Sequence, residues 1–194
     1  VESNYGSYIL GKQWDWILDE LKNDRDSRRC TIVIHQPYHK TKNSKDLPCT
    51  QYLQFFIRDN KLHLGVNMRS NDIVYGFCND VFNFALFQQL MLNELKPIYP
   101  SLELGSYYHH AGSLHIYDMH YEMRDNILMD VEADGDYSLE SLPKYTLNSW
   151  ITREYIKENN MELPTEDLPK LELMAFTSKQ MQKLFKPKKR LYHI

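Results

Sequence analysis

NMRSNDIVYGFCND, residues 67–80, is the stretch around which the rest of the chain is organised. It follows a strand-like run from Lys61 to Val66 and leads into a long apolar helical pattern. It gathers an arginine, a serine, several asparagines, two aspartates and a glycine. A turn that only reversed the chain would need neither the arginine nor the carboxylates, and loops held between rigid elements often carry binding residues. We interpret this stretch as a loop that holds a nucleotide.

The composition is typical of a globular chain with a sizeable core. Its 194 residues fit one domain, with or without a tail, and 42% hydrophobic with 25% charged residues is ordinary. A formal charge of -3 argues against stable nucleic-acid binding. No apolar run reaches the roughly 20 residues that span a bilayer, and no secretory leader is visible. Three cysteines and eight histidines show no metal-ligand spacing, so we expect no metal and a reducing, cytoplasmic setting.

Hydrophobic periodicity predicts a mixture of helices and strands. Residues 1–10 are expected to form a loop, and 37–45 a polar, basic loop. Helices are expected at Lys12–Leu21, from Val81 to Leu95, and at Glu122–Val131. Strands are expected at Cys30–Ile34, Thr50–Ile57, Lys61–Val66, Leu102–Tyr108 and Ser113–Tyr117, with a hairpin turn at Asp59-Asn60.

The last part of the chain is less regular. Partial helical spacing covers Tyr145–Asn159, and a short helix is expected at Ser178–Phe185. We predict a single domain over residues 1–194, with an irregular C-terminal segment at 160–194. Its basic end, from Lys186 to Arg190, is interpreted as a solvated tail.

Several motifs, taken as a set, resemble the thymidylate synthase family in order and spacing. They are Asp26-Ser27-Arg28-Arg29, Leu47-Pro48-Cys49 with Gln54-Phe55, Arg69-Ser70-x-Asp72, Gly76, and His115-Ile116-Tyr117. The resemblance covers residues 4–122 and implies an α+β fold. In this fold a large mixed β-sheet forms a dimer interface, and helices pack on its other face.

Within the family, the closer resemblance is to the phage-type deoxycytidylate hydroxymethylases. Thr50 stands where the methylases have a histidine, and Met68 where they have a glutamine. Asp80 stands where they have the asparagine that reads uracil. The neighbouring Asn79 would restore an asparagine if the alignment slipped by one residue, but the spacings from Arg69 and Gly76 favour Asp80.

Cys49 is the candidate nucleophile. Carbon 5 of a pyrimidine nucleotide is a poor nucleophile until something adds to carbon 6, and a thiolate both adds and leaves well. A cation such as Arg69 nearby would favour the thiolate. Without the resemblance, Cys49 is more simply a small buried residue at the start of a strand. Cys30 and Cys78 are interpreted as packing residues.

The resemblance also implies phosphate ligands. Arg69 and Ser70 combine a guanidinium fork with a hydroxyl donor. Arg28 and Arg29 would join them from the other subunit, which makes the protein an obligate homodimer. Taken alone, Arg28-Arg29 would be a solvated strand end.

Four further residues take roles by resemblance. Gln54 would position the nucleotide near the cysteine, and Asp72 would contact folate. His115 and Tyr117 alternate along a predicted strand and would hydrogen-bond the sugar 3′-hydroxyl. The simpler interpretation is an ordinary surface side chain for Gln54 and a core polar group for His115 and Tyr117.

Asp80 has two competing interpretations. A carboxylic group can accept a hydrogen bond from the exocyclic amine of cytosine and, when protonated, donate to the ring nitrogen. A site built on such a pair can reject the wrong base by roughly 10⁴–10⁵. Alternatively, Asp80 caps a helix beginning near Val81, where aspartate is favoured.

The function implied is that of a deoxycytidylate 5-hydroxymethyltransferase that uses 5,10-methylenetetrahydrofolate as its one-carbon donor. Cys49 would add to carbon 6 of the pyrimidine nucleotide monophosphate, and water would finally trap an exocyclic methylene. A pyrimidine methylase and a non-catalytic nucleotide-binding relative remain alternatives. Members of the family carry a further segment, with a catalytic glutamate, before the point where this sequence begins. We therefore expect a longer protein or, failing that, an impaired relative.

Overall fold

The computed structural model describes residues 4–41 and 43–129, all of which lie in the first of two units, Val1–Lys144 and Tyr145–Ile194. The expected helices at Tyr145–Asn159 and Ser178–Phe185 and the basic tail lie outside the described residues. The helices are α1 Gly6–Ile9, α2 Lys12–Asn23, α3 Gly76–Leu95 and α4 Tyr121–Met129. The strands are β1 Thr31–Val33, β2 Thr50–Arg58, β3 Lys61–Met68, β4 Asn71–Asp72, β5 Glu103–Ala111 and β6 Leu114–His115. Short 3-10 helices lie at Pro37–Thr41 and Asp118–His120.

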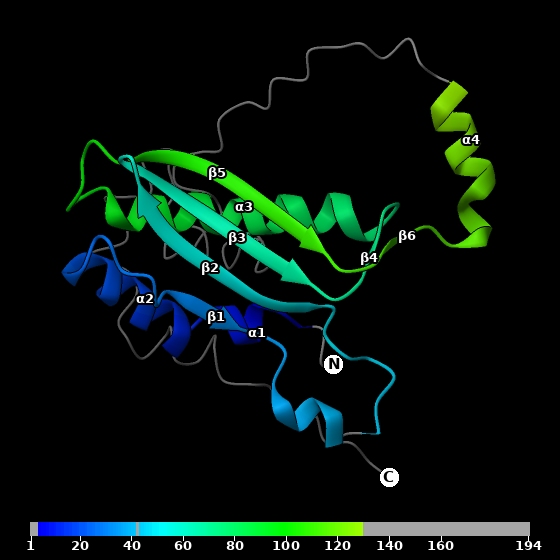
Figure 1. Ribbon diagram of the computed structural model, residues 1–194, viewed down its shortest axis with the longest axis horizontal. Helices are drawn as coiled ribbons and strands as arrows, with labels where there is room; N and C mark the ends of the chain where they lie inside the picture. Colours follow the sequence, from blue (N-terminus) through cyan, green and yellow to red (C-terminus); the bar gives the residue numbers. More distant parts are fainter. Residues whose placement is uncertain (1–3, 42, 130–194) are drawn as a thin grey trace, which may run out of the picture. The chain divides into compact units, whose positions relative to one another are not determined.

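The main sheet is mixed and has the strand order β1-β2-β3-β5 (Figure 1). β2 pairs antiparallel with β1 and β3, whereas β5 runs parallel to β3 after the chain has crossed through α3. The predicted hairpin is confirmed. Its turn residues Asp59 and Asn60 both have positive φ, 51° and 59°, which suits a two-residue hairpin turn between twisted strands.

One face of this sheet carries the core. Alternate side chains of β2 and β3 are fully or almost fully buried on it: Leu53, Phe55, Ile57, Leu62, Leu64 and Val66. From α2, the Trp14 ring meets Phe55 and Phe87 edge to face, each at 6.1 Å between centroids. The period of two in the strands and the helical spacing of Trp14, Ile17 and Leu21 therefore predicted this layer correctly.

Three expectations about element boundaries were wrong. The predicted loop at residues 1–10 contains α1, and the predicted strand Ser113–Tyr117 shrinks to the two residues of β6. The long helix begins at Gly76, five residues before Val81. Its early start follows from Asp72, whose carboxylate accepts the amide hydrogens of Val74 and Tyr75 just before the helix. In the described residues, no helix is both long and apolar enough to cross a membrane.

A buried glutamine fastens α3 to the sheet. The Nε2 atom of Gln88, which is 2% exposed, donates to the carbonyl of Leu62 at 2.8 Å, and the carbonyls of Gly105 and Ser106 lie at 3.2 and 3.3 Å. The pairing of β3 with β5 is irregular between Leu62 and Leu64. The side chain of Gln88 thus donates to backbone carbonyls at the point where the hydrogen-bond ladder between β3 and β5 is irregular.

We expect Gln88→Leu to lower the free energy of unfolding by about 1–3 kcal/mol, because it leaves buried carbonyls without a donor. Urea denaturation measures this change. Gln89→Leu is the matched control, since among the described residues that side chain bonds Asn93, one helical turn away on the same helix. Equal losses for the two variants would contradict this role of Gln88.

Candidate functional site

The Cys49 loop is held by Arg69. Because Thr50 pairs with Met68, the next residues on each side, Cys49 and Arg69, are also adjacent, and the Arg69 amide donates to the Cys49 carbonyl at 2.9 Å. The guanidinium donates from Nε to the Pro48 carbonyl and from Nη2 to the Leu47 carbonyl, each at 3.1 Å. Two of its five N–H groups are engaged in this way. The exposed guanidinium is thus held against the backbone just before the half-buried Cys49, and it keeps N–H donors for an anion.

Tyr5 holds the same loop from the other side. Its hydroxyl accepts the amide hydrogens of Cys49 at 3.0 Å and Thr50 at 3.3 Å. Its ring stacks on Phe84 of α3, with 6.2 Å between centroids and 17° between planes. Tyr5 was expected to lie in a loop, and its contact with Cys49, which joins residues 44 positions apart, was not expected.

Asp80 does not cap α3. The helix begins at Gly76 after Tyr75, which makes no side-chain cap bond, so Asp80 lies in the second turn. The cap interpretation is therefore wrong. The carboxylate that serves the start of the helix is that of Asp72, which accepts from Tyr75 N at 2.9 Å and Val74 N at 3.3 Å. These hydrogen bonds, that from Tyr75 foremost, lower the pKa of Asp72, so the carboxylate stays ionised.

The side chain of Asp80 lies in a partly buried polar setting. Burial raises the pKa of its carboxyl from 3.8 to about 6, and a hydrogen bond from Asn71 opposes the shift. The neighbouring Asn79 is exposed and its Nδ2 turns back to the Tyr75 carbonyl at 2.6 Å. Of the two candidates for the base-reading position, Asp80 is the one that contacts the interior.

Asn71, Tyr107 and His109 form, with Asp80, what we call the Asp80 cluster. Asn71 Nδ2 lies 2.9 Å from His109 Nε2 and 3.1 Å from Met68 Sδ. The Tyr107 hydroxyl lies 2.7 Å from His109 Nδ1. Burial and, secondarily, the charge of Asp80 raise the pKa of Tyr107. Tyr107 and His109 were not expected here from the sequence, because only the parallel pairing of β5 with β3 brings them beside Asn71.

The pairing of β4 with β6 brings His115 beside Asp72. The rings of His115 and Tyr117 meet edge to face at 4.9 Å, although Tyr117 lies beyond the strand. The half-buried Ser70 immediately precedes β4. The residues from Arg69 to Asp72 thus lie between the Cys49 loop and the candidate sugar ligands.

Three other candidates lie elsewhere in this chain. Gln54 pairs with Thr31, five residues along β2 from Cys49, a strand distance of roughly 17 Å. Its Nε2 donates to the Arg28 carbonyl at 3.0 Å. The 70%-exposed Arg29 side chain pairs with Glu20 at 2.6 Å. Arg28, Arg29 and Gln54 are therefore not brought to Cys49 within one chain.

The other cysteines differ from each other. Cys30 is buried as predicted, and burial raises the pKa of its thiol. Cys78 is exposed, so its interpretation as a packing residue was wrong. Across residues 4–41 and 43–129, no group of three His, Cys, Asp or Glu side chains could hold a metal ion.

Comparison with known proteins gives a consistent set of relatives. The family model described as thymidylate synthase matches residues 9–180. The deoxycytidylate 5-hydroxymethyltransferase of Enterobacteria phage T6 is 36% identical over 137 residues, which cover 65% of this chain and 55% of that protein. Thymidylate synthase 1 of Bacillus spizizenii is 30% identical over 122 residues, 63% of this chain and 40% of that protein.

Among solved structures, thermostable thymidylate synthase A from Bacillus subtilis matches with a TM-score of 0.52 and 31% identity, over 62% of this chain and 40% of that one. The expected α+β fold is confirmed by this match. The chain spans about half the length of the curated relatives it matches, 55% for the phage protein.

The raised pKa of Asp80 predicts a pH-dependent effect on stability. Below pH 3.8 the carboxyl is protonated in both the folded and unfolded states, and as pH rises through about 6 the folded state loses stability. Asp80→Asn should therefore raise the free energy of unfolding at about pH 8, by on the order of 1 kcal/mol after allowing for partial solvation, and not at about pH 4.

Urea denaturation at both pH values measures the effect. Asp19→Asn, at an exposed position of α2, is the matched control and should show no such difference. An equal change in the Asp80 variant at both pH values would count against a buried, reluctantly ionised carboxyl.

Proposed function

The chain belongs to the thymidylate synthase family, and from this membership we propose that it is a deoxycytidylate 5-hydroxymethyltransferase. In this proposal a one-carbon unit is transferred to carbon 5 of the nucleotide and water completes the hydroxymethyl group. The observation that carries the choice of cytosine is the position of Asp80, in the second turn of α3 with a partly buried carboxyl whose pKa is raised to about 6. The phage relatives, 36% identical, support the same choice and a virus-encoded protein that acts in the host cytoplasm.

Cys49 supplies the nucleophile in this scheme. Its thiolate forms a bond to carbon 6, and the electron pair of the C5–C6 double bond moves toward carbon 5, which becomes nucleophilic. The backbone of Cys49 is held from two sides by Tyr5 and Arg69, which fixes the position from which the sulfur attacks. The N–H groups of Arg69 that the loop carbonyls do not engage suit the phosphate of the same nucleotide.

Methylenetetrahydrofolate would supply the one-carbon unit. The charge of Asp72 suits a contact with this cofactor. Because the pKa of Asp72 is lowered, its carboxylate stays ionised and can accept hydrogen bonds from N–H groups such as those of a pterin ring. It is also held in place, since two backbone amides fix both of its oxygens. His115 and Tyr117, which lie beside Asp72, are proposed ligands of the sugar 3′-hydroxyl.

Asp80 is proposed to read the base. Cytosine presents a donor at the exocyclic amine and an acceptor at ring nitrogen 3. A protonated carboxyl offers the complement, an acceptor oxygen and an O–H donor. Burial favours the protonated form, since it raises the pKa of Asp80 to about 6. The carboxyl is therefore partly protonated near neutral pH even before a base arrives.

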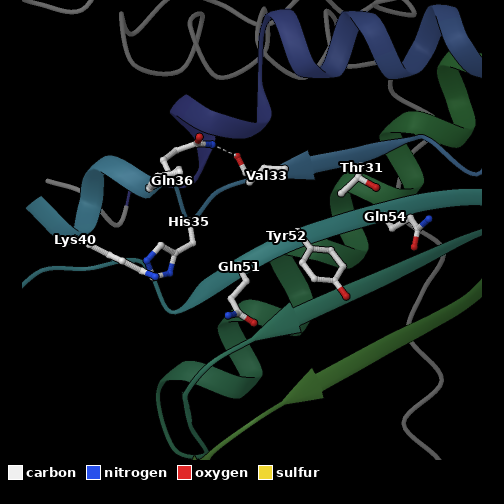
Figure 2. Close-up of a pocket in the computed structure, with 9 residues that line it drawn as sticks. Thr31, Val33, His35, Gln36, Lys40, Gln51, Tyr52 and Gln54 are labelled. Atoms are coloured by element: carbon white, nitrogen blue, oxygen red, sulfur yellow. Dashed lines mark hydrogen bonds between the residues drawn. The ribbon is translucent and has the colours of Figure 1, made fainter.

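A second subunit is part of the proposal. None of the described helices covers the sheet face turned away from α3, where Val33 and Tyr52 are each 40% exposed. Phe56, His63 and Tyr108 stack across this face, with the first two rings 5.1 Å apart. Figure 2 shows Thr31, Tyr52 and Gln54 beside an open hollow of about 660 Å³ on the same surface.

An exposed face of this kind suits burial against another protein surface. Pairing the faces of two copies would also bring Arg28 and Arg29, which lie far from Cys49 in their own chain, toward the partner's site. Glu20 accepts from Arg29 Nε at 2.9 Å, which orients the guanidinium from its own helix. We therefore propose a homodimer in which each phosphate site is completed by the other subunit.

The product test separates the candidate functions. With methylenetetrahydrofolate, the protein should convert deoxycytidylate, in preference to deoxyuridylate, into a product with the mass of the hydroxymethyl nucleotide. Asp80→Asn should lower the preference for deoxycytidylate about tenfold or more. Cys49→Ala should abolish turnover and keep nucleotide binding, because only the nucleophile is removed.

Mass spectrometry of the products gives the readout. A methyl product would indicate a methylase, the function of the Bacillus relatives, instead. Absence of turnover in the unmodified protein, with binding retained, would indicate a non-catalytic relative.

Subunit complementation tests the shared site. Cys49→Ala and the double variant Arg28→Ala/Arg29→Ala should each be inactive, and mixing them after dissociation should restore about a quarter of the activity, because half of the dimers then carry one complete site. The control mixes Cys49→Ala with the triple variant Cys49→Ala/Arg28→Ala/Arg29→Ala, and should stay inactive. If the first mixture also stays inactive, the arginines do not act across the interface.

A further inference from the structure

The guanidinium of Arg29 is held along one edge by Glu20. Its Nε donates to Glu20 Oε1 at 2.9 Å, and its Nη2 lies 2.6 Å from the same oxygen. These contacts use the edge of the guanidinium that contains Nε. They leave the outer edge, formed by Nη1 and the second N–H of Nη2, for another acceptor. Two parallel N–H groups on such an edge match two oxygens of a phosphate.

Ser27 fixes the carboxylate of Glu20 in turn. The serine is 3% exposed, and its Oγ donates to Glu20 Oε1 at 2.6 Å while it accepts the amide hydrogen of Arg29 at 3.2 Å. Three donors thus converge on one oxygen of a side chain that is only 12% exposed. The hydrogen bond from Ser27, foremost among several effects, lowers the pKa of Glu20, so the carboxylate is ionised near neutral pH.

Orientation is the main physical consequence of this arrangement. The Arg29 side chain is 70% exposed, and ion pairs at exposed positions contribute little to stability. A long side chain that is free in solution, however, loses its rotational freedom when it binds a ligand, and this loss weakens binding. Glu20 and Ser27 restrict Arg29 before any ligand arrives. Within the described residues, the guanidinium of the neighbouring Arg28 has no such partner, and only its backbone carbonyl is engaged, by Gln54.

We propose that Glu20, fixed by Ser27, pre-organises Arg29 as a phosphate ligand for the nucleotide site of the other subunit. Glu20 is a positioning residue, because it acts on the phosphate through Arg29. The inference rests on the proposed function, in which Arg29 completes a phosphate site across a homodimer. It adds the groups that aim this arginine, a carboxylate from the end of α2 and a hydroxyl from the segment before β1.

Charge and orientation predict opposite effects for the loss of Glu20. Its negative charge opposes phosphate binding, whereas its hold on Arg29 favours it. Glu20→Leu removes both, and Glu20→Gln removes only the charge, since an amide oxygen can still accept from Arg29 and Ser27. Glu20→Leu should raise the Kd for deoxycytidylate about three- to tenfold, and Glu20→Gln should raise it less. An unchanged or lower Kd in Glu20→Leu would overturn the proposal.

Calorimetric titration with deoxycytidylate and with deoxycytidine measures these Kd values. The nucleoside has no phosphate, so its Kd should be the same in Glu20→Leu and the unmodified protein. In an Arg29→Ala background, Glu20→Leu should have no further effect on deoxycytidylate binding. In an Arg28→Ala background, the matched control, it should keep its full effect. General damage to the fold would instead weaken both ligands and act in both backgrounds.

Subunit mixing tests which site the arginine serves. Glu20→Leu alone should turn over with a raised KM for deoxycytidylate. When it is mixed with Cys49→Ala after dissociation, each mixed dimer combines an intact Cys49 with an Arg29 that a partner Glu20 still holds. A component with the KM of the unmodified protein should then appear, and it should be absent when the second variant is Cys49→Ala/Glu20→Leu. If it is absent from both mixtures, Glu20 acts within its own subunit and the proposal fails.

These measurements distinguish failure of the inference from failure of the proposed function. If Arg29→Ala binds deoxycytidylate as tightly as the unmodified protein, the proposed phosphate role of Arg29 fails. If Arg29→Ala weakens binding and Glu20→Leu does not, the arginine binds phosphate without help from Glu20, and only this inference fails.

Discussion

The antiparallel pairing of β2 with β3 is the constraint on which the site depends. It brings Cys49, which precedes one strand, beside Arg69, which follows the other, because Thr50 lies opposite Met68. The bond from the Arg69 amide to the Cys49 carbonyl extends the ladder by one step. A slip of one residue would turn every side chain of the strand to the opposite face and would also separate Cys49 from Arg69.

This constraint was readable in the sequence, since it rests on local signals. The alternation in β2 and β3 and the Asp59-Asn60 turn specify both the strands and their register. The start of α3 was not readable in the same way. The apolar pattern begins near Val81, whereas the backbone becomes helical at Gly76, after Asp72 has bonded the preceding amides. The spacing of apolar residues shows which face of a helix is buried. It does not show where the backbone becomes helical when a polar side chain of the preceding loop determines that point.

The candidate site residues also differ in whether their signal is local in the sequence. Candidates that lie in compact motifs, such as Arg69 and Cys49, could be named because those motifs resemble the family's motifs. Tyr5 and His109 act across 44 and 38 residues of chain, on a backbone amide and on an amide side chain. A tyrosine before a short helix and a histidine in a strand give no local sign of such a partner. They become visible only when the parallel pairing of β5 and the packing of α1 are known.

A carboxyl at position 80 that is proposed to read the base meets two problems that an amide would not meet. An asparagine has one donor end and one acceptor end, so its orientation alone can read a base. A carboxyl ionises, and even when protonated its two ends are interchangeable. Burial raises the pKa of Asp80 to about 6 and so increases the share of the neutral acid, at the expense of stability above about pH 6. Burial does not solve the second problem, because it leaves the two oxygens of the carboxyl chemically alike. A carboxyl proposed to read cytosine therefore needs a neighbouring group, or the base itself, to make its two oxygens different.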